Sequence, residues 1–220
     1  MPVTEPAAKR AYDAVKDRIL TGDLPAGDLL SEVEIAHELA VSRTPVHEAF
    51  LRLEAEDLLR LIPRRGAVVV PVPPQEAVDL LEVRRALETA AVRRLAGEEY
   101  AAARAALAER LADVVGEQER HAGERDVAAF AAVDEAFHRA IVTASGNALA
   151  DRFYRTLGDR QRRMTVGAVG SRPDHLGVLV GEHRRLAQLV AARDPDGFDA
   201  ALVAHLDTTH DTFLGRGGHR

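Results

Sequence analysis

Four side chains that can bind a metal ion fall on apolar faces of predicted helices in the second half of the chain. Asp134 and His138 are four residues apart, so a helix places both on one face, among apolar side chains. His183 and His205 each fall inside a later apolar stripe. Buried polar groups need partners. A divalent cation would satisfy all four, because carboxylate oxygen and imidazole nitrogen bind zinc and its first-row neighbours.

A plainer interpretation applies to each of these residues taken singly. A histidine on an apolar face is more often a hydrogen-bonded core residue than a metal ligand, and Asp134 and His138 can pair with each other. Four such residues on the inward faces of three helices favour a shared site. The chain contains no Cys, so a disulfide framework and a thiolate metal site are both excluded.

The helices that carry these residues belong to a long helical region after Pro74. Helical periodicity continues almost to the end of the chain and strand patterns are lacking, which predicts an antiparallel all-α bundle of about six helices. The expected helices span residues 75–95, 98–120, 125–145, 148–166, 174–193 and 198–214.

Residues 1–73 have the pattern of a smaller domain with three helices and a β-hairpin. Apolar spacing predicts a helix over 9–21, and Ser31 begins an S-x-x-E capping box that starts a second helix to about Leu39. Pro45 suits the first turn of a third helix. Two alternating runs flank the turn Pro63–Gly66, which is typical of a β-hairpin. The fold class is therefore mainly α, with an N-terminal winged helix-turn-helix and a C-terminal helical bundle.

A winged helix-turn-helix places the first turn of its third helix on base edges and its hairpin on phosphates or the minor groove. The candidate DNA-binding residues are Ser42, Arg43, Thr44, His47, Arg64, Arg65 and Gly66. The net charge of −6 excludes a protein that coats nucleic acid through overall positive charge. DNA binding therefore requires a local basic patch and a dimer. A protein-binding helical module with ordinary surface arginines is the alternative.

The sequence ILTGDLPAGDLLSEVEIAHELAVSRTPVHEAFLRLEAEDLL, followed by PRRGAVVV, resembles the amino-terminal domain of GntR-family bacterial transcription regulators. Arg43 and Gly66 match the family pattern. The family usually has Arg where this chain has Val33 and His47, and Gly where it has Asp57. Because Val cannot donate a hydrogen bond and His is not equivalent to Arg at a bidentate contact, the resemblance implies the fold together with altered operator contacts.

Three later segments, LLEVRRALETAAVRRLA, VDEAFHRAIVTASGN and GEHRRLAQLVAARDPDGFDAALVAHL, are similar to the helical ligand-sensing (FCD) domain of the FadR-type branch of that family. In its metal-binding members the ligands are one Asp and three His, which the resemblance places at Asp134, His138, His183 and His205. It also implies Arg84 as a residue that binds the carboxylate of an effector, with Asn147 as a further pocket residue. An ion pair between Arg84 and Glu88 is the alternative.

These observations predict a DNA-binding transcription regulator, with a DNA-binding domain over 1–73 and an effector-, metal-binding and dimerisation domain over 74–220. We expect a homodimer that binds double-stranded operator DNA and represses transcription. We expect it to respond to a small carboxylic acid that binds at a divalent metal ion. Zinc is the expected ion, with nickel or manganese as alternatives. The rival hypotheses are a metal-dependent enzyme acting on a small acid and a regulator whose metal is purely structural.

The sequence also predicts where the protein acts. Apolar runs are shorter than the about 18 residues that a membrane-spanning helix needs, and no signal-peptide pattern is present. We therefore expect no membrane association and a cytoplasmic location.

Overall fold

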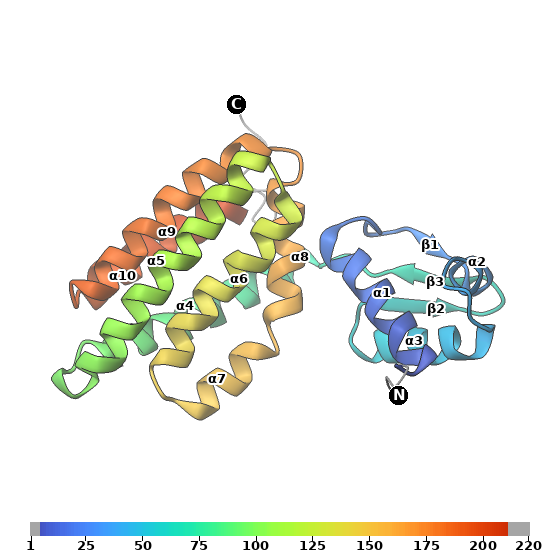
Figure 1. Ribbon diagram of the computed structural model, residues 1–220, viewed down its shortest axis with the longest axis horizontal. Coiled ribbons are helices and arrows are strands. Elements are labelled where there is room, and N and C mark those ends of the chain that lie inside the picture. Colours follow the sequence, from blue (N-terminus) through green and yellow to red (C-terminus); the bar gives the residue numbers. More distant parts are fainter. Residues whose placement is uncertain (1–4, 211–220) are drawn as a thin grey trace. The chain divides into compact units, whose positions relative to one another are not determined.

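The computed structural model of the protein describes residues 5–210, which form two compact units divided between Val72 and Pro73. The first unit contains three α-helices and a three-stranded antiparallel sheet, and the described part of the second contains seven α-helices and no strand (Figure 1). The predicted fold class is confirmed for both units. Each unit is described by itself below.

The first unit is a winged helix-turn-helix. Its elements are α1 (Ala7–Thr21), β1 (Leu29–Leu30), α2 (Glu32–Glu38), α3 (Arg43–Ala55), β2 (Leu59–Ile62) and β3 (Gly66–Val69). β2 and β3 form the predicted hairpin, and the sheet order is β1-β3-β2. The sequence did not predict β1, because a two-residue strand shows no alternation of its own. β1 exists through its pairing with β3, where Leu30 lies opposite Ala67.

Local sequence signals set the ends of these helices. α1 ends where Gly22 adopts the left-handed conformation, with φ at 86°. Ser31 caps α2, and its Oγ accepts a hydrogen bond from the Glu34 backbone N–H at 3.4 Å. α3 begins at Arg43, so Pro45 lies at its third residue, still inside the first turn where the missing N–H is harmless.

α3 buries one face and exposes the other. Val46, Ala49, Phe50 and Leu53 are fully buried in the core of the first unit. Truncating a buried Phe to Ala typically lowers the free energy of unfolding by about 3–5 kcal/mol, so the burial of Phe50 contributes strongly to the packing of α3 on this core. The N-terminal turn of α3 is exposed and available for contacts with another molecule.

The second unit is a helical bundle. Its helices are α4 (Pro74–Leu95), α5 (Ala101–Glu124), α6 (Val127–Ala144), α7 (Ala148–Arg155), α8 (Gly158–Val169), α9 (Leu176–Ala191) and α10 (Pro195–His210). α5 packs against α6 and α9, and α10 packs against α9 and α4 (Figure 1). None of the helices within residues 5–210 has the length and hydropathy that crossing a bilayer requires.

One predicted helix, over residues 148–166, is two helices in the structure. α7 ends at Arg155 with Thr156 as its C-cap, and α8 begins at Gly158; Thr and Gly are both weak helix formers. A Cβ atom on Gly158 would lie 3.3 Å from Oε1 of Glu135 on α6, so the break also allows a close approach between helices. α8 then extends three residues past its expected end, to Val169. The expected end of the last helix, at Leu214, lies outside the described residues.

Candidate metal centre and nucleic-acid interface

Asp134, His138, His183 and His205 converge inside the helical bundle. α6 supplies Asp134 and His138 one turn apart, α9 supplies His183 and α10 supplies His205. One possible ligand atom from each residue lies within 4.8 Å of the others. The four residues are only 0–2% exposed. The structure therefore brings together the four residues that the apolar stripes indicate.

Each histidine has its Nδ1 atom held by an acceptor side chain. The three hydrogen bonds run from His138 to Glu88 Oε2 (2.7 Å), from His183 to Gln118 Oε1 (3.0 Å) and from His205 to Glu182 Oε2 (2.7 Å). An acceptor at Nδ1 fixes the proton there and leaves Nε2 with a lone pair. Metal-binding histidines commonly donate their second nitrogen to a carboxylate or carbonyl in this way, which orients the ring.

Two of these Nε2 atoms face the carboxylate of Asp134. His183 Nε2 lies 3.2 Å from Asp134 Oδ1, and His138 Nε2 lies 3.8 Å from it. Thr165 of α8 donates to the other oxygen, Oδ2, at 3.2 Å. Among the described residues, Asp134 Oδ1, His138 Nε2 and His183 Nε2 have no hydrogen-bond partner. A cation bound between these buried atoms would satisfy all three.

The surroundings favour an ionised carboxylate and neutral rings. Burial lowers the pKa of His183 to about 3 and also lowers the pKa of His138. Burial acts to raise the pKa of Asp134, but the close approach of His183 and the neighbouring His138 and Arg84 outweigh it, so this pKa lies well below its ordinary value. Neutral imidazole and ionised carboxylate are the forms that bind a first-row divalent ion, at about 2.0–2.2 Å. The residues present therefore fit such an ion.

Arg84 is a buried cation next to this cluster. Its Nε donates to Glu88 Oε1 at 3.1 Å, the same carboxylate that holds His138. Tyr154 of α7 donates to that oxygen as well, at 2.6 Å. Burial alone would lower the pKa of Arg84, but Tyr154, Glu88 and Asp134 raise it more, so the guanidinium stays charged. The structure thus contains the ion pair with Glu88 that was the alternative interpretation of Arg84. Nη2 of Arg84 nevertheless has no hydrogen-bond partner among the described residues.

Asn147 lies apart from Arg84 and the histidines. It is exposed, and its Oδ1 accepts hydrogen bonds from the backbone N–H groups of Leu149 and Ala150, both at 3.2 Å. These bonds make Asn147 the N-cap of α7. Within residues 5–210, no hydrogen bond joins it to the cluster.

Several residues around the cluster were not indicated by the sequence patterns. They are Gln118, Tyr154, Gln161, Thr165 and Glu182, together with Glu88 in its role as the partner of His138. Gln118 falls on the buried stripe of α5, four residues after Val114, so a polar residue on an apolar stripe could have identified it. The other residues carry no comparable signal.

Five of the seven candidate DNA-binding residues line one groove between α3 and the turn of the hairpin. The groove has a volume of about 370 Å³, and its lining includes Arg43, His47, Arg64, Arg65 and Gly66. Ser42 and Thr44 are exposed at the start of α3, outside that lining. Arginines from two elements therefore form the local basic patch that DNA binding requires.

Glu32 of α2 joins this groove as a partner of the reading side chains. Its Oε1 accepts from His47 Nδ1 at 2.7 Å, and its Oε2 lies 3.5 Å from Arg43 Nη2. Val33 beside it is 55% exposed and also lines the groove. The position where the family usually has Arg thus faces the groove with an apolar side chain.

Gly66 has a backbone role at the edge of the groove. Its φ is 104°, a region that favours glycine, and a Cβ atom there would overlap the carbonyl oxygen of Leu30. Glycine therefore lets β1 and β3 approach each other behind the hairpin turn.

Comparison with known proteins identifies both units. The model of the "Bacterial regulatory proteins, gntR family" matches residues 7–69, and the model of the "FCD domain" matches residues 79–208. The chain belongs to the GntR family. The resemblance inferred from the sequence motifs is thereby confirmed. This GntR protein is a DNA-binding transcription regulator and not an enzyme.

Named relatives agree with this assignment. The GntR chain is 33% identical over 201 residues to a "Probable D-xylose utilization operon transcriptional repressor" of Paenarthrobacter nicotinovorans, covering 90% of this chain and 85% of the relative. It is 28% identical over 207 residues to the "HTH-type transcriptional repressor RspR" of Escherichia coli K12, covering 92% and 87%. A solved GntR regulator from Rhodococcus sp. RHA1 has the same fold, with a TM-score of 0.77, 22% identity and coverage of 97% and 99%.

Proposed function

We propose that this GntR regulator is a repressor whose FCD domain holds one divalent metal ion. The ligands are Oδ1 of Asp134 and the Nε2 atoms of His138, His183 and His205. The supporting observation is that all three Nδ1 atoms are already bound by acceptors, which leaves buried Nε2 lone pairs beside an ionised carboxylate. Zinc is the expected ion, and the donor set also suits nickel or manganese.

The effector is a small carboxylic acid that binds at the metal and at Arg84. A bound ion supplies a fixed positive charge for the carboxylate of the acid. Arg84 supplies a buried guanidinium whose Nη2 has no hydrogen-bond partner among the described residues, and guanidinium–carboxylate pairs are strong and geometrically specific. Asn147 remains the further pocket residue of this hypothesis: its Oδ1 caps α7, and its Nδ2 amide is left to donate to the acid.

The protein acts on DNA as a homodimer in the cytoplasm. Two copies of α3 would read the two halves of a near-palindromic operator, as dimeric helix-turn-helix proteins do. Binding of the acid would bias the arrangement of the helical bundle and, through it, the spacing of the two DNA-binding units. Two relatives are named repressors, which supports repression of transcription over activation.

Elemental analysis of purified variants tests the metal centre. We expect about one ion per chain in the wild type and none in Asp134→Ala or His183→Ala, because each change removes a ligand. His175→Ala is the matched control, since His175 lies in a short 3-10 helix outside the cluster and should leave the metal in place. Full occupancy in Asp134→Ala, with circular dichroism confirming a folded protein, contradicts the assignment.

Calorimetric titration with small carboxylic acids tests the effector site. We expect binding to the metal-loaded protein, and loss of binding after chelation or in Arg84→Met. Equal binding of the acid with and without chelator would show that the metal takes no part in effector binding and has only a structural role. Loss of binding after chelation that Arg84→Met does not reproduce would remove Arg84 from the site.

A further inference from the structure

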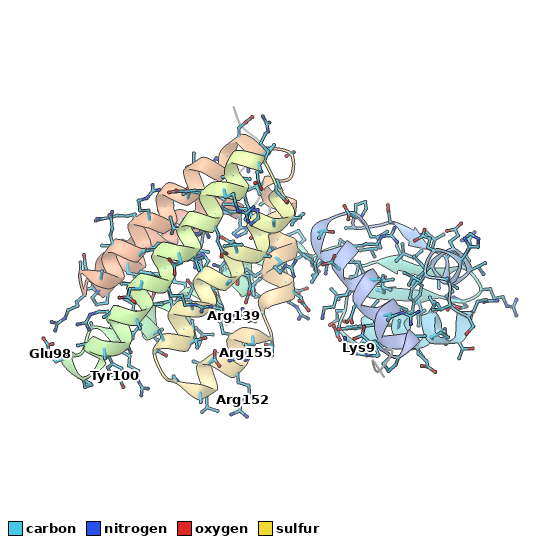
Figure 2. All side chains as sticks on the ribbon, viewed as in Figure 1. Lys9, Glu98, Tyr100, Arg139, Arg152 and Arg155 are labelled. Atoms are coloured by element: carbon cyan, nitrogen blue, oxygen red, sulfur yellow. The ribbon has the colours of Figure 1, made fainter. Side chains whose placement is uncertain are left out.

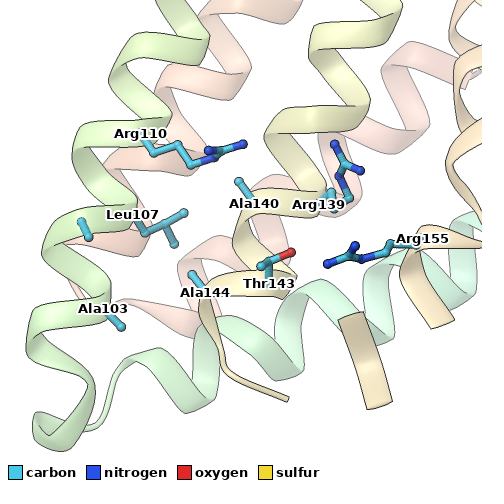
Figure 3. A pocket seen from close by; sticks show the side chains of 9 residues that line it. Ala103, Leu107, Arg110, Arg139, Ala140, Thr143, Ala144 and Arg155 are labelled. Atoms are coloured by element: carbon cyan, nitrogen blue, oxygen red, sulfur yellow. The ribbon is translucent and has the colours of Figure 1, made fainter. Parts of the chain in front are cut away.

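A second polar pocket lies on the outside of the helical bundle, between α5, α6 and α7. It has a volume of about 450 Å³. Figure 3 shows three arginines at the pocket, Arg110 from α5, Arg139 from α6 and Arg155 from α7. Thr143 also lines it, and its hydroxyl donates to Asp151 at 2.6 Å. A concave space with three guanidinium groups is suited to a small anion.

The pocket is separate from the metal cluster. α6 contributes to both sites, but Asp134 and His138 are buried inside the bundle, whereas Arg139 and Thr143 are accessible on its outer side. No residue of the metal cluster lines the pocket. An occupant of the pocket would therefore not compete directly for the metal ligands.

The charges in the pocket do not cancel. Arg155 pairs with Asp151 at 2.7 Å, and Arg139 pairs with Glu135 at 3.3 Å. Arg110 makes no hydrogen bond or ion pair with any residue in the described part of the chain. Two carboxylates thus face three guanidinium groups, and one positive charge is left over. The two paired arginines keep further N–H groups available, because a guanidinium has five donors.

The rest of the lining is apolar and small. It consists of Ala103, Ala106, Leu107, Ala140 and Ala144. The alanines create the hollow, since larger side chains at these positions would fill it. One end of the pocket is therefore cationic, and its wall offers contact to a hydrocarbon or aromatic group.

We propose that this pocket binds a small amphiphilic organic anion. Its carboxylate, phosphate or sulfonate group contacts Arg110, Arg139 and Arg155, and its apolar body lies on the alanine wall. The three charged contacts come from three different helices, so the occupant connects α5, α6 and α7 at a place distinct from the metal centre.

Titration of the full chain with 8-anilinonaphthalene-1-sulfonate tests the proposal, because this probe combines a sulfonate with an aromatic body and becomes fluorescent in apolar surroundings. We expect saturable binding of one probe per chain. Arg110→Ala should weaken it about tenfold or more by removing a charged contact. Ala106→Phe should do the same by filling the hollow from an exposed helix position that does not disturb the core.

Arg152→Ala is the matched control for charge. Arg152 is exposed on α7 next to the site but does not line the pocket (Figure 2), so its removal should leave the probe affinity unchanged. Absence of saturable binding, or equal losses in Arg110→Ala and Arg152→Ala, would each overturn the proposal.

Discussion

Arg43 is the candidate base-reading residue with the clearest geometry. It is the first residue of α3, its side chain is 68% exposed, and it lines the groove beside the hairpin turn. We expect Arg43→Ala to weaken specific operator binding by about 1–3 kcal/mol, the usual value of a good bidentate base contact. Fluorescence anisotropy on an operator selected from a random pool measures the change. Arg10→Ala on α1 is the control, and an unchanged affinity in Arg43→Ala removes Arg43 from the reading set.

His47 is expected to read a different kind of base from the arginine usual at this position. Glu32 accepts a hydrogen bond from Nδ1 at 2.7 Å, and with the single imidazole proton held there Nε2 is an acceptor. In the major groove, an acceptor matches the amino group of adenine or cytosine, whereas arginine donates to guanine. We therefore expect His47→Arg to shift the selected base opposite this residue towards guanine. The same selected sequence for both proteins would contradict this role of His47.

The candidate metal centre shows which residues of a site can be predicted from a sequence pattern and which cannot. Asp134, His138, His183 and His205 could be singled out because each is a polar residue on an apolar stripe. Their hydrogen-bond partners could not, because Glu182 and Thr165 have no such pattern and become relevant only through contacts between helices. Sequence periodicity thus identifies the residues that a helix buries. The structure is needed to show which side chains of other helices contact them.

At the scale of elements, an ion pair joins α10 to α4. Arg85 donates two hydrogen bonds to Asp199, at 2.8 and 2.7 Å, and Thr89 donates a third at 2.9 Å. The hydrogen bonds from Arg85 are the main reason that the pKa of Asp199 falls to about 2. The pair is partly exposed, so solvent screens it, and we expect Asp199→Asn to lower the free energy of unfolding by about 0.5–1 kcal/mol at neutral pH.

The pH dependence of this contribution has a definite sign. Because the folded-state pKa of Asp199 is lower than the unfolded value of about 3.9, its stabilisation is fully present above that value and is lost as pH falls towards 2. The difference in melting temperature between the wild type and Asp199→Asn should stay constant above about pH 5 and shrink below pH 4. Asp113→Asn, an exposed change in α5, should show no such trend. A difference that grows on acidification would refute the assignment.

The elements themselves were predicted where the signal is local. The hairpin around Gly66 and the cap at Ser31 depend on neighbouring residues alone and are confirmed. β1 was missed because its strand character comes from pairing with β3, far along the chain. The break between α7 and α8 was missed because it depends in part on how closely Gly158 approaches another helix.

At the scale of the whole molecule, each unit has its own core and all four candidate ligands lie in the second unit. Removing the ion should therefore destabilise the second unit alone. A ligand at a hundred times its dissociation constant stabilises a fold by about 2.7 kcal/mol. Hydrogen exchange measured by mass spectrometry should show faster exchange in α6, α9 and α10 after chelation, with α1 and α3 unchanged. Faster exchange in both units, or in neither, would contradict this expectation.

The closure of the candidate metal centre has a kinetic consequence. Six of the seven helices described in the second unit contribute a candidate ligand or its direct hydrogen-bond partner, and α7 adds Tyr154, which donates to Glu88. The four candidate ligands are at most 2% exposed. An ion held there leaves only when the helices separate, so its loss to excess chelator should proceed at a rate independent of chelator concentration. Metal taken up during folding would then be a lasting part of the protein.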